Sequence, residues 1–153
     1  MLNRLTGREN KFLEYALVAG QFGGIFLIAI LTHFWSLSVI AIAIAILGFA
    51  FGGYSILVMK LGNFHVLPRP VSRSELVSRG PYKYIRHPMY TSVLVVAAAL
   101  IAGDFSLIKL GIGILLTFCL ILKLEYEENL FVQRFPEYDA YRKITKRVIP
   151  FLW

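Results

Sequence analysis

Long apolar segments constrain the fold of this chain more than any other feature. Residues 12–31 contain only Glu14 and Gln21 as strongly polar members, and residues 38–59 contain no charged side chain. A helix rises about 1.5 Å per residue, so about 20 residues cross a hydrocarbon core about 30 Å thick. These two segments predict a pair of membrane-spanning helices.

The second half of the chain has two further apolar runs. Residues 88–102 would form a helix only about 22 Å long, which is short for a crossing and would be helped by burial against neighbouring protein or by a re-entrant path. Gly103 and Asp104 predict a turn before the fourth run, residues 105–122. Since 58% of the residues are hydrophobic, an ordinary soluble domain is excluded. The expected fold class is all-α, integral membrane, with about four transmembrane helices.

Charged residues follow the last apolar run. Residues 123–135 read as a charged amphipathic helix that Pro136 should end, and residues 138–147 read as a second, short basic segment. We expect both to form amphipathic cytoplasmic helices at the membrane surface.

The distribution of basic residues predicts the topology. The net charge is +7, and every Lys and Arg except Lys109 falls in residues 1–11, in the connection 60–86 or after residue 122. The positive-inside rule places these three regions, and both termini, on the cytoplasmic side. Lys109 is expected to extend to the far interface and Glu14 to the near one.

Two pairs of glycines have the spacing that lets helices approach closely in lipid. Gly20 and Gly24 lie one turn apart in the first apolar segment, and Gly48 and Gly52 do so in the second. This spacing favours packing of the first two helices against each other.

The chain offers no sequence pattern for a metal site. Cys119 is the single cysteine, which excludes a disulfide framework and a cysteine-based metal centre. The three histidines, His33, His65 and His87, are far apart in the sequence. We therefore expect no metal.

Chemistry is concentrated in the stretch 79–90, which is basic, aromatic and interrupted by prolines. Pro88 predicts a helix that starts there, with His87 at its boundary. Such a start presents free backbone N–H groups and a positive dipole end, which suit an anionic ligand group. The amides concerned belong to Met89, Tyr90 and Thr91, and the neighbouring bases are Arg79, Lys83 and Arg86.

A second group of charged residues begins where the last apolar run ends. Lys123 and Glu127 are four residues apart and share a helix face, while Glu128 points about 100° away. On composition alone this pattern is also typical of a solvated face, with Lys123 as an interface anchor.

Together these motifs resemble the isoprenylcysteine carboxyl methyltransferase family of integral-membrane, S-adenosylmethionine-dependent enzymes, which are related to phospholipid methyltransferases. The matching motifs are Gly80-Pro81-Tyr82, Arg86-His87-Pro88-Met89-Tyr90, Glu127-Glu128, Phe135-Pro136-Glu137-Tyr138 and Tyr141. The resemblance covers residues 74–150. It implies one membrane domain, residues 1–153, in which residues 1–62 are a helical anchor pair and residues 63–153 are the catalytic half.

The resemblance also implies site residues. Lys123 and Arg86 would be catalytic, with Lys123 facing the acceptor. Contacts to S-adenosylmethionine would come from Leu76, Val77, Tyr82, His87, Pro88, Met89, Tyr90, Glu127 and Glu128.

The chain departs from the family pattern at four positions. Lys123 stands where an arginine is usual, and lysine offers a point charge in place of a two-pronged grip on a carboxylate. The other departures are Ser74, Ser92 and Pro136. The acceptor, whether an isoprenylcysteine-type carboxylate or another membrane-soluble molecule, therefore stays open.

Three functions follow as alternatives. The first is a membrane methyltransferase with a cytoplasmic active site and a lipophilic small acceptor. The second is an NADPH-dependent reductase of the membrane sterol-reductase type, which shares a similar histidine, proline and tyrosine motif. The third is a non-enzymatic membrane scaffold. Membrane lipid is an expected partner, whereas nucleic acid and an obligate protein partner are not expected.

Overall fold

The structure is a computed structural model of the chain, and it describes residues 11–59 and 76–149. Within these ranges the chain is helical and contains no named β-strand, so the all-α prediction is confirmed. The elements are α1 (Lys11–Ile30), η2 (Phe34–Ser36), α2 (Val39–Met59), η3 (Gly80–Lys83), α3 (Pro88–Gly103), α4 (Leu107–Arg134) and α5 (Tyr138–Ile144).

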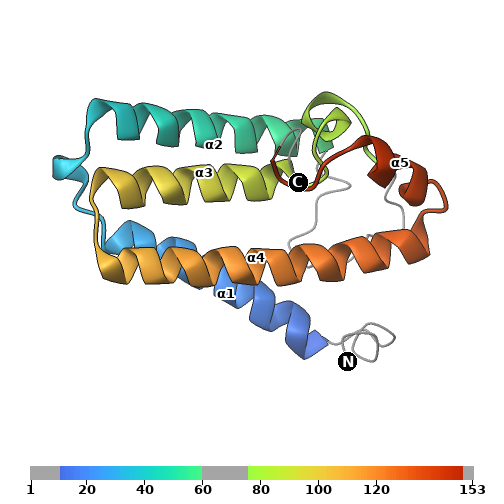
Figure 1. Cartoon of the computed structure of the whole chain (residues 1–153), viewed down its shortest axis with the longest axis horizontal. Coiled ribbons are helices and arrows are strands. Elements are labelled where there is room, and N and C mark those ends of the chain that lie inside the picture. Colours follow the sequence, from blue (N-terminus) through green and yellow to red (C-terminus); the bar gives the residue numbers. More distant parts are fainter. Residues whose placement is uncertain (1–10, 60–75, 150–153) are drawn as a thin grey trace.

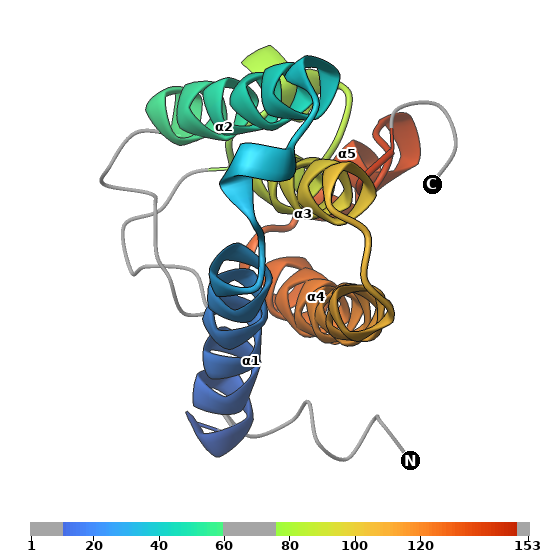
Figure 2. The same ribbon diagram turned by 90° about the vertical axis from the view of Figure 1, so that its left-hand side faces the viewer.

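The four long helices form two packed pairs. α2 lies along α3, α1 lies against α4, and α3 lies between α2 and α4 (Figures 1 and 2). The turns that contain η2 and residues 104–106 are at one end of the bundle. The start of α3, the end of α4, η3 and α5 are at the other end, which we call the polar end.

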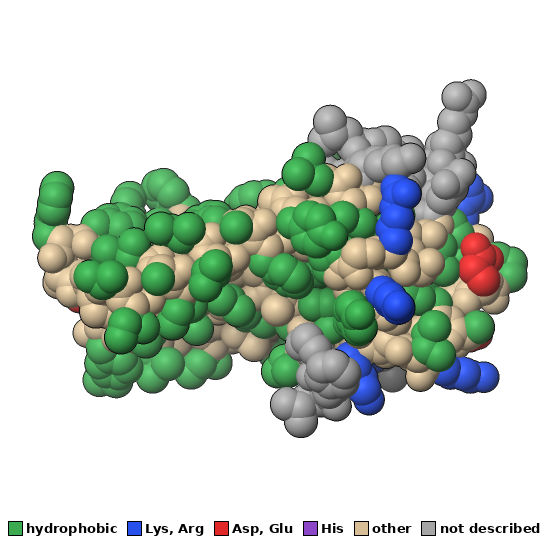
Figure 3. Space-filling model, turned by 90° about the horizontal axis from the view of Figure 1, so that it is seen from above, with side chains coloured by type: hydrophobic (Ala, Val, Ile, Leu, Met, Phe, Trp, Pro, Cys, Tyr) green, Lys and Arg blue, Asp and Glu red, His purple; other side chains and the backbone are tan. Residues whose placement is uncertain are grey.

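Hydropathy and length identify which helices can cross a membrane. α1, α2 and α4 are long and apolar enough to cross, and α3 is a shorter apolar helix of 16 residues. Because α3 lies between α2 and α4, neighbouring protein covers much of it. Apolar side chains cover the long part of the molecule, while charged side chains gather toward the polar end (Figure 3). The chain is an integral membrane protein.

The glycines do not pair the helices as the sequence suggested. A Cβ at Gly24 would lie 3.2 Å from Leu116 of α4, and a Cβ at Gly48 would lie 2.8 Å from Val96 of α3. The predicted packing of the first two helices through these residues is therefore wrong. Glycine spacing marks a face that allows close approach, but it does not identify the partner helix.

Two charged side chains that were expected to extend to the membrane interfaces are buried in the bundle. Glu14 has no exposed surface and accepts a hydrogen bond from the Tyr126 hydroxyl at 3.0 Å. Lys109 is 1% exposed and donates to Asp104 at 2.6 Å. Each has a polar partner, which offsets the cost of burying a charge. Because Asp104 lies in the turn at the end of the bundle opposite the polar end, the Lys109 side chain still reaches toward that end.

Candidate functional site

The conformation of the loop before α3 depends on a glycine with positive φ, Gly80, and on the buried ring of Tyr82. Gly80 has φ +58°, in the left-handed region that favours glycine. Two residues later the side chain of Tyr82 is buried, and its carbonyl accepts a hydrogen bond from the Tyr141 hydroxyl at 2.6 Å. The loop is therefore anchored to α5, which comes some sixty residues later in the sequence.

The segment after α5 continues this attachment along the loop. Ile85 and Lys146 form an isolated parallel bridge. The Arg86 amide donates to the Lys146 carbonyl at 2.7 Å, and the His87 amide donates to the Arg147 carbonyl at 2.9 Å. These bonds hold residues 85–87 against the segment after α5, up to the first residue of α3.

Glu128 at the end of α4 is tied to the same loop. Its Oε1 accepts from Arg86 Nε at 2.6 Å, and the two side chains are 4% and 7% exposed. The Arg86 guanidinium also donates to the Thr145 carbonyl at 2.5 Å and to the Arg142 carbonyl at 3.1 Å. The solvated-face interpretation is wrong for Glu128, because the C-terminal segment covers it.

Glu127, His87 and Tyr90 form the centre of the candidate site. The Tyr90 hydroxyl donates to Glu127 Oε1 at 2.6 Å, and His87 Nδ1 lies 3.6 Å from Glu127 Oε2. The rings of His87 and Tyr90 are stacked, with centroids 5.2 Å apart and planes 7° from parallel. The two groups of residues that the sequence singled out therefore meet at one end of the bundle.

The buried phenols near this centre are neutral donors. Burial raises the pKa of Tyr82, Tyr138 and Tyr141 well above the usual value of a phenol. At physiological pH these hydroxyls cannot act as bases. The Tyr138 hydroxyl and His87 Nε2 are buried and have no hydrogen-bond partner among the residues that the structure describes, although Nε2 lies 3.4 Å from Glu128 Oε1.

Lys123 lies one turn before Glu127 and is also buried. It is 4% exposed, and its ammonium donates to Gln21 Oε1 at 2.7 Å. The same ammonium lies 5.4 Å from the centroid of the Tyr90 ring, within cation–π range. Lys123 is thus not an exposed interface anchor.

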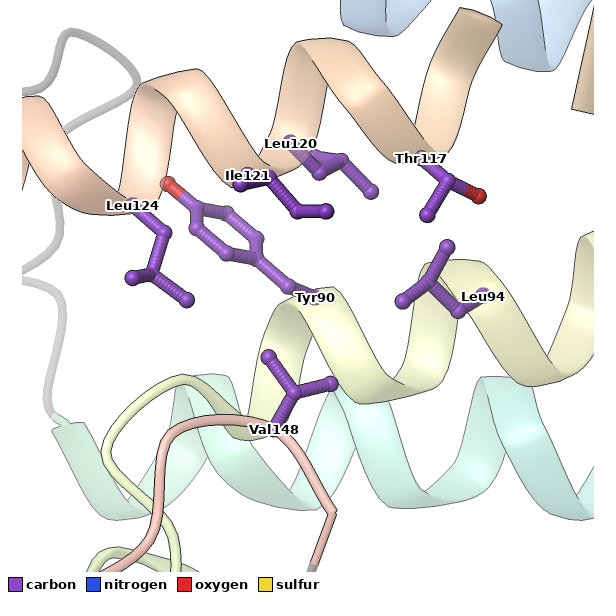
Figure 4. Close-up of a pocket in the computed structure, with 7 residues that line it drawn as sticks. All are labelled: Tyr90, Leu94, Thr117, Leu120, Ile121, Leu124 and Val148. Atoms are coloured by element: carbon purple, nitrogen blue, oxygen red, sulfur yellow. The ribbon is translucent and has the colours of Figure 1, made fainter. Parts of the chain in front are cut away.

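A small apolar cavity adjoins Tyr90 on the side of the bundle interior (Figure 4). It has a volume of about 40 Å³, which is far below the roughly 300–1,000 Å³ of typical small-molecule sites. Its lining is apolar. The lining residues are Tyr90, Leu94, Thr117, Leu120, Ile121, Leu124 and Val148.

The start of α3 is only partly available to an anion. Pro88 is its first residue and His87 caps it, as the sequence predicted. However, the amides of Tyr90 and Thr91 donate to the His87 carbonyl at 3.0 and 3.2 Å. The prediction that these two amides are free is wrong, because the first turn closes directly on its cap.

The family model described as phospholipid methyltransferase matches residues 15–137. The chain belongs to the phospholipid methyltransferase family. This family includes the isoprenylcysteine carboxyl methyltransferases, so the resemblance seen in the motifs is confirmed. Its members are membrane methyltransferases that generally use S-adenosylmethionine. A comparison with curated proteins finds no significant match.

The phospholipid methyltransferase match includes most of α1, all of α2 to α4 and the central residues of the site. Among the other residues suggested by the resemblance, Pro88 is buried at the start of α3, and Met89 beside it is half-buried. Leu76 and Val77 are half-buried in the irregular segment before η3. Ser74 lies outside the described residues.

Sequence reasoning missed the contribution of α1. Glu14 and Gln21 both bond to α4, to Tyr126 and Lys123 respectively. The available signal was their spacing of seven residues, which puts two polar side chains on one face of an otherwise apolar helix.

Proposed function

We propose that this chain is an S-adenosylmethionine-dependent methyltransferase that acts on a lipophilic small acceptor dissolved in the bilayer. The observation that carries the proposal is the junction of His87, Tyr90 and Glu127. It joins the start of α3 to the last turns of α4 at the polar end of an apolar bundle. Membership of a methyltransferase family supports the reaction type. The concentration of basic residues at the polar end supports a cytoplasmic site and cytoplasmic termini.

The donors and acceptors at the junction fit the cofactor chemically. S-adenosylmethionine supplies an activated methyl group on a sulfonium, and it carries a carboxylate, an ammonium and two ribose hydroxyls. Glu127, whose side chain keeps 14% exposure, can accept from an ammonium or a hydroxyl. The Tyr138 hydroxyl and His87 Nε2 are buried polar atoms that could bond to such a ligand.

The remaining cofactor residues surround this centre in the proposal. Leu76, Val77 and Tyr82 would contact the adenosine from the loop side, and Pro88 and Met89 from the start of α3. The cavity of about 40 Å³ is too small for a nucleotide. The cofactor would therefore bind on the solvent side of Glu127.

Arg86 and Glu128 have a different role in the proposal. Their polar atoms are bonded to each other and to the segment after α5, so they position His87 and the loop. The Lys123 ammonium lies 5.4 Å from the centroid of the Tyr90 ring, and in the proposal it would face the acceptor. A carboxylate acceptor needs no general base at neutral pH, whereas an amine or thiol acceptor would have to lose a proton.

Methyl transfer into lipid tests the proposal directly. Purified protein is incubated with S-adenosylmethionine labelled in its methyl group and with a total lipid extract, and the labelled product is identified by mass spectrometry. We expect label in a lipid-soluble product and a large loss of label with His87→Ala.

Calorimetric titration with NADPH and with S-adenosylhomocysteine separates the alternatives. Binding of NADPH alone would support a reductase, and binding of neither nucleotide would support a scaffold. Either result overturns the proposal.

A further inference from the structure

The first helix contributes a row of buried polar groups to the side of the site that faces the bundle interior. Glu14 and Gln21 lie on the face of α1 that packs against α4, together with the buried Leu17. Gln21 is the eleventh residue of this 20-residue helix, about 15 Å from its start. A polar side chain at that depth is costly unless it is bonded, and this one accepts from Lys123.

The direction of Lys123 is unusual for a lysine near a membrane surface. Side chains in a helix lean toward its N-terminus, and the N-terminus of α4 is at the end of the bundle opposite the site. Lys123 follows this lean, and its ammonium reaches Gln21 Oε1 at 2.7 Å instead of turning outward to water. Gln21 thus holds a positive charge beneath the polar end.

That charge is connected to the proposed reaction centre. The ammonium lies 5.4 Å from the centroid of the Tyr90 ring, whose hydroxyl bonds to Glu127 at 2.6 Å. The apolar cavity between α3 and α4 also begins at Tyr90 (Figure 4). An acceptor held against the Tyr90 ring would have the Lys123 ammonium close to it.

We propose that Gln21 is a positioning residue that holds the Lys123 ammonium beside Tyr90, where it binds an anionic group, carboxylate or phosphate, of the acceptor lipid. This inference rests on the proposed function and adds to it a role for α1. A neutral amide oxygen suits the role, because it orients the ammonium without cancelling its charge. A carboxylate at position 21 would hold the ammonium equally well but would neutralise it.

The test compares acceptor kinetics in variants of the full chain in detergent micelles. The acceptor probes are farnesylated N-acetylcysteine (a carboxylate), dioleoylphosphatidylethanolamine (a phosphate) and dodecanethiol (no anionic group). We expect methyl transfer to at least one anionic probe. Gln21→Ala should raise the KM for that probe about tenfold, the loss of one charge-assisted hydrogen bond, with kcat and the Kd of S-adenosylhomocysteine within about twofold.

Two variants separate positioning from simple tethering of α1. Gln21→Glu should raise the acceptor KM at least as much as Gln21→Ala, although it keeps the contact with Lys123. In a Lys123→Met background, Gln21→Ala should have no further effect on that KM. Leu17→Ala is the matched control, because it loosens the same face of α1 without touching Lys123.

The outcomes are distinct. The inference is overturned if Gln21→Glu has the wild-type acceptor KM. It is also overturned if Gln21→Ala changes that KM equally in the wild-type and Lys123→Met backgrounds. In either case Gln21 would only tether α1 to α4. If the wild type binds S-adenosylhomocysteine but methylates only dodecanethiol, or none of the probes, the inference is overturned. The cofactor assignment then still stands. Failure of the wild type to bind S-adenosylhomocysteine overturns the proposed function, and the inference with it.

Discussion

Replacing Glu128 by glutamine should destabilise the protein far more than the same change at Glu125, one turn of α4 away. Glu128 is 4% exposed, and its bond to Arg86 at 2.6 Å links α4 to the loop and to the C-terminal segment. Removing one partner of a buried ion pair costs roughly 3–5 kcal/mol, because the other charge is left buried. Glu125 is 43% exposed in its pair with Arg147, and such a pair is worth about 0–1 kcal/mol.

These free energies convert into well-separated melting temperatures. For a chain of this size 1 kcal/mol shifts the Tm by about 2–4 °C, so Glu128→Gln should lower it by roughly 6–20 °C. Glu125→Gln should lower it by less than about 4 °C. Cys119, the single thiol, packs against Gly20 of α1, so its labelling by a thiol-reactive dye during heating reports separation of α1 and α4. Equal shifts in the two variants would refute the buried role of Glu128.

Two further predictions concern the bundle. Gly52→Ala should destabilise the protein by about 1–3 kcal/mol, because the added Cβ would clash with the Ser92 side chain. Gly53→Ala should be nearly neutral, because the space around Gly53 is open. Chemical denaturation of both variants measures the two free energies of unfolding. A hydrogen bond from Lys109 holds the pKa of Asp104 well below its usual value, so the ionised carboxylate stabilises the fold fully above its ordinary pKa of about 4 and progressively less as the pH falls below it. The difference in Tm between the wild type and Asp104→Asn should therefore narrow only below pH 4. A difference that stays constant down to pH 2 would contradict the assignment.

Much of the helical framework was predictable because apolar length is a local property. The first two spans and the start of α3 at Pro88 agree with the structure within one residue. The partner of each helix was not predictable in the same way. Gly20 and Gly48 mark tight faces, but whether such a face meets α4 or α3 depends on how the whole bundle closes.

The motif residues of the candidate site could be predicted from the sequence, but the contacts of Glu128 and Gln21 that hold them in place could not. His87, Tyr90 and Glu127 were singled out by sequence, and they lie together. The burial of Glu128 depends on pairing between residues 84–87 and the segment after α5, a contact that leaves no periodic pattern in either stretch. The role of Gln21 was missed for a related reason: a polar residue in an apolar run looks the same whichever side of the helix faces protein.

The most direct test of the central claim is calorimetric binding of S-adenosylhomocysteine to the wild type, Glu127→Gln and the matched variant Glu125→Gln. Glu127 bonds to Tyr90 and faces His87, whereas Glu125 pairs with Arg147. We expect binding by the wild type and by Glu125→Gln, and affinity at least about tenfold weaker in Glu127→Gln, because a charged hydrogen-bond acceptor is lost. Equal affinity in all three proteins would contradict the central claim.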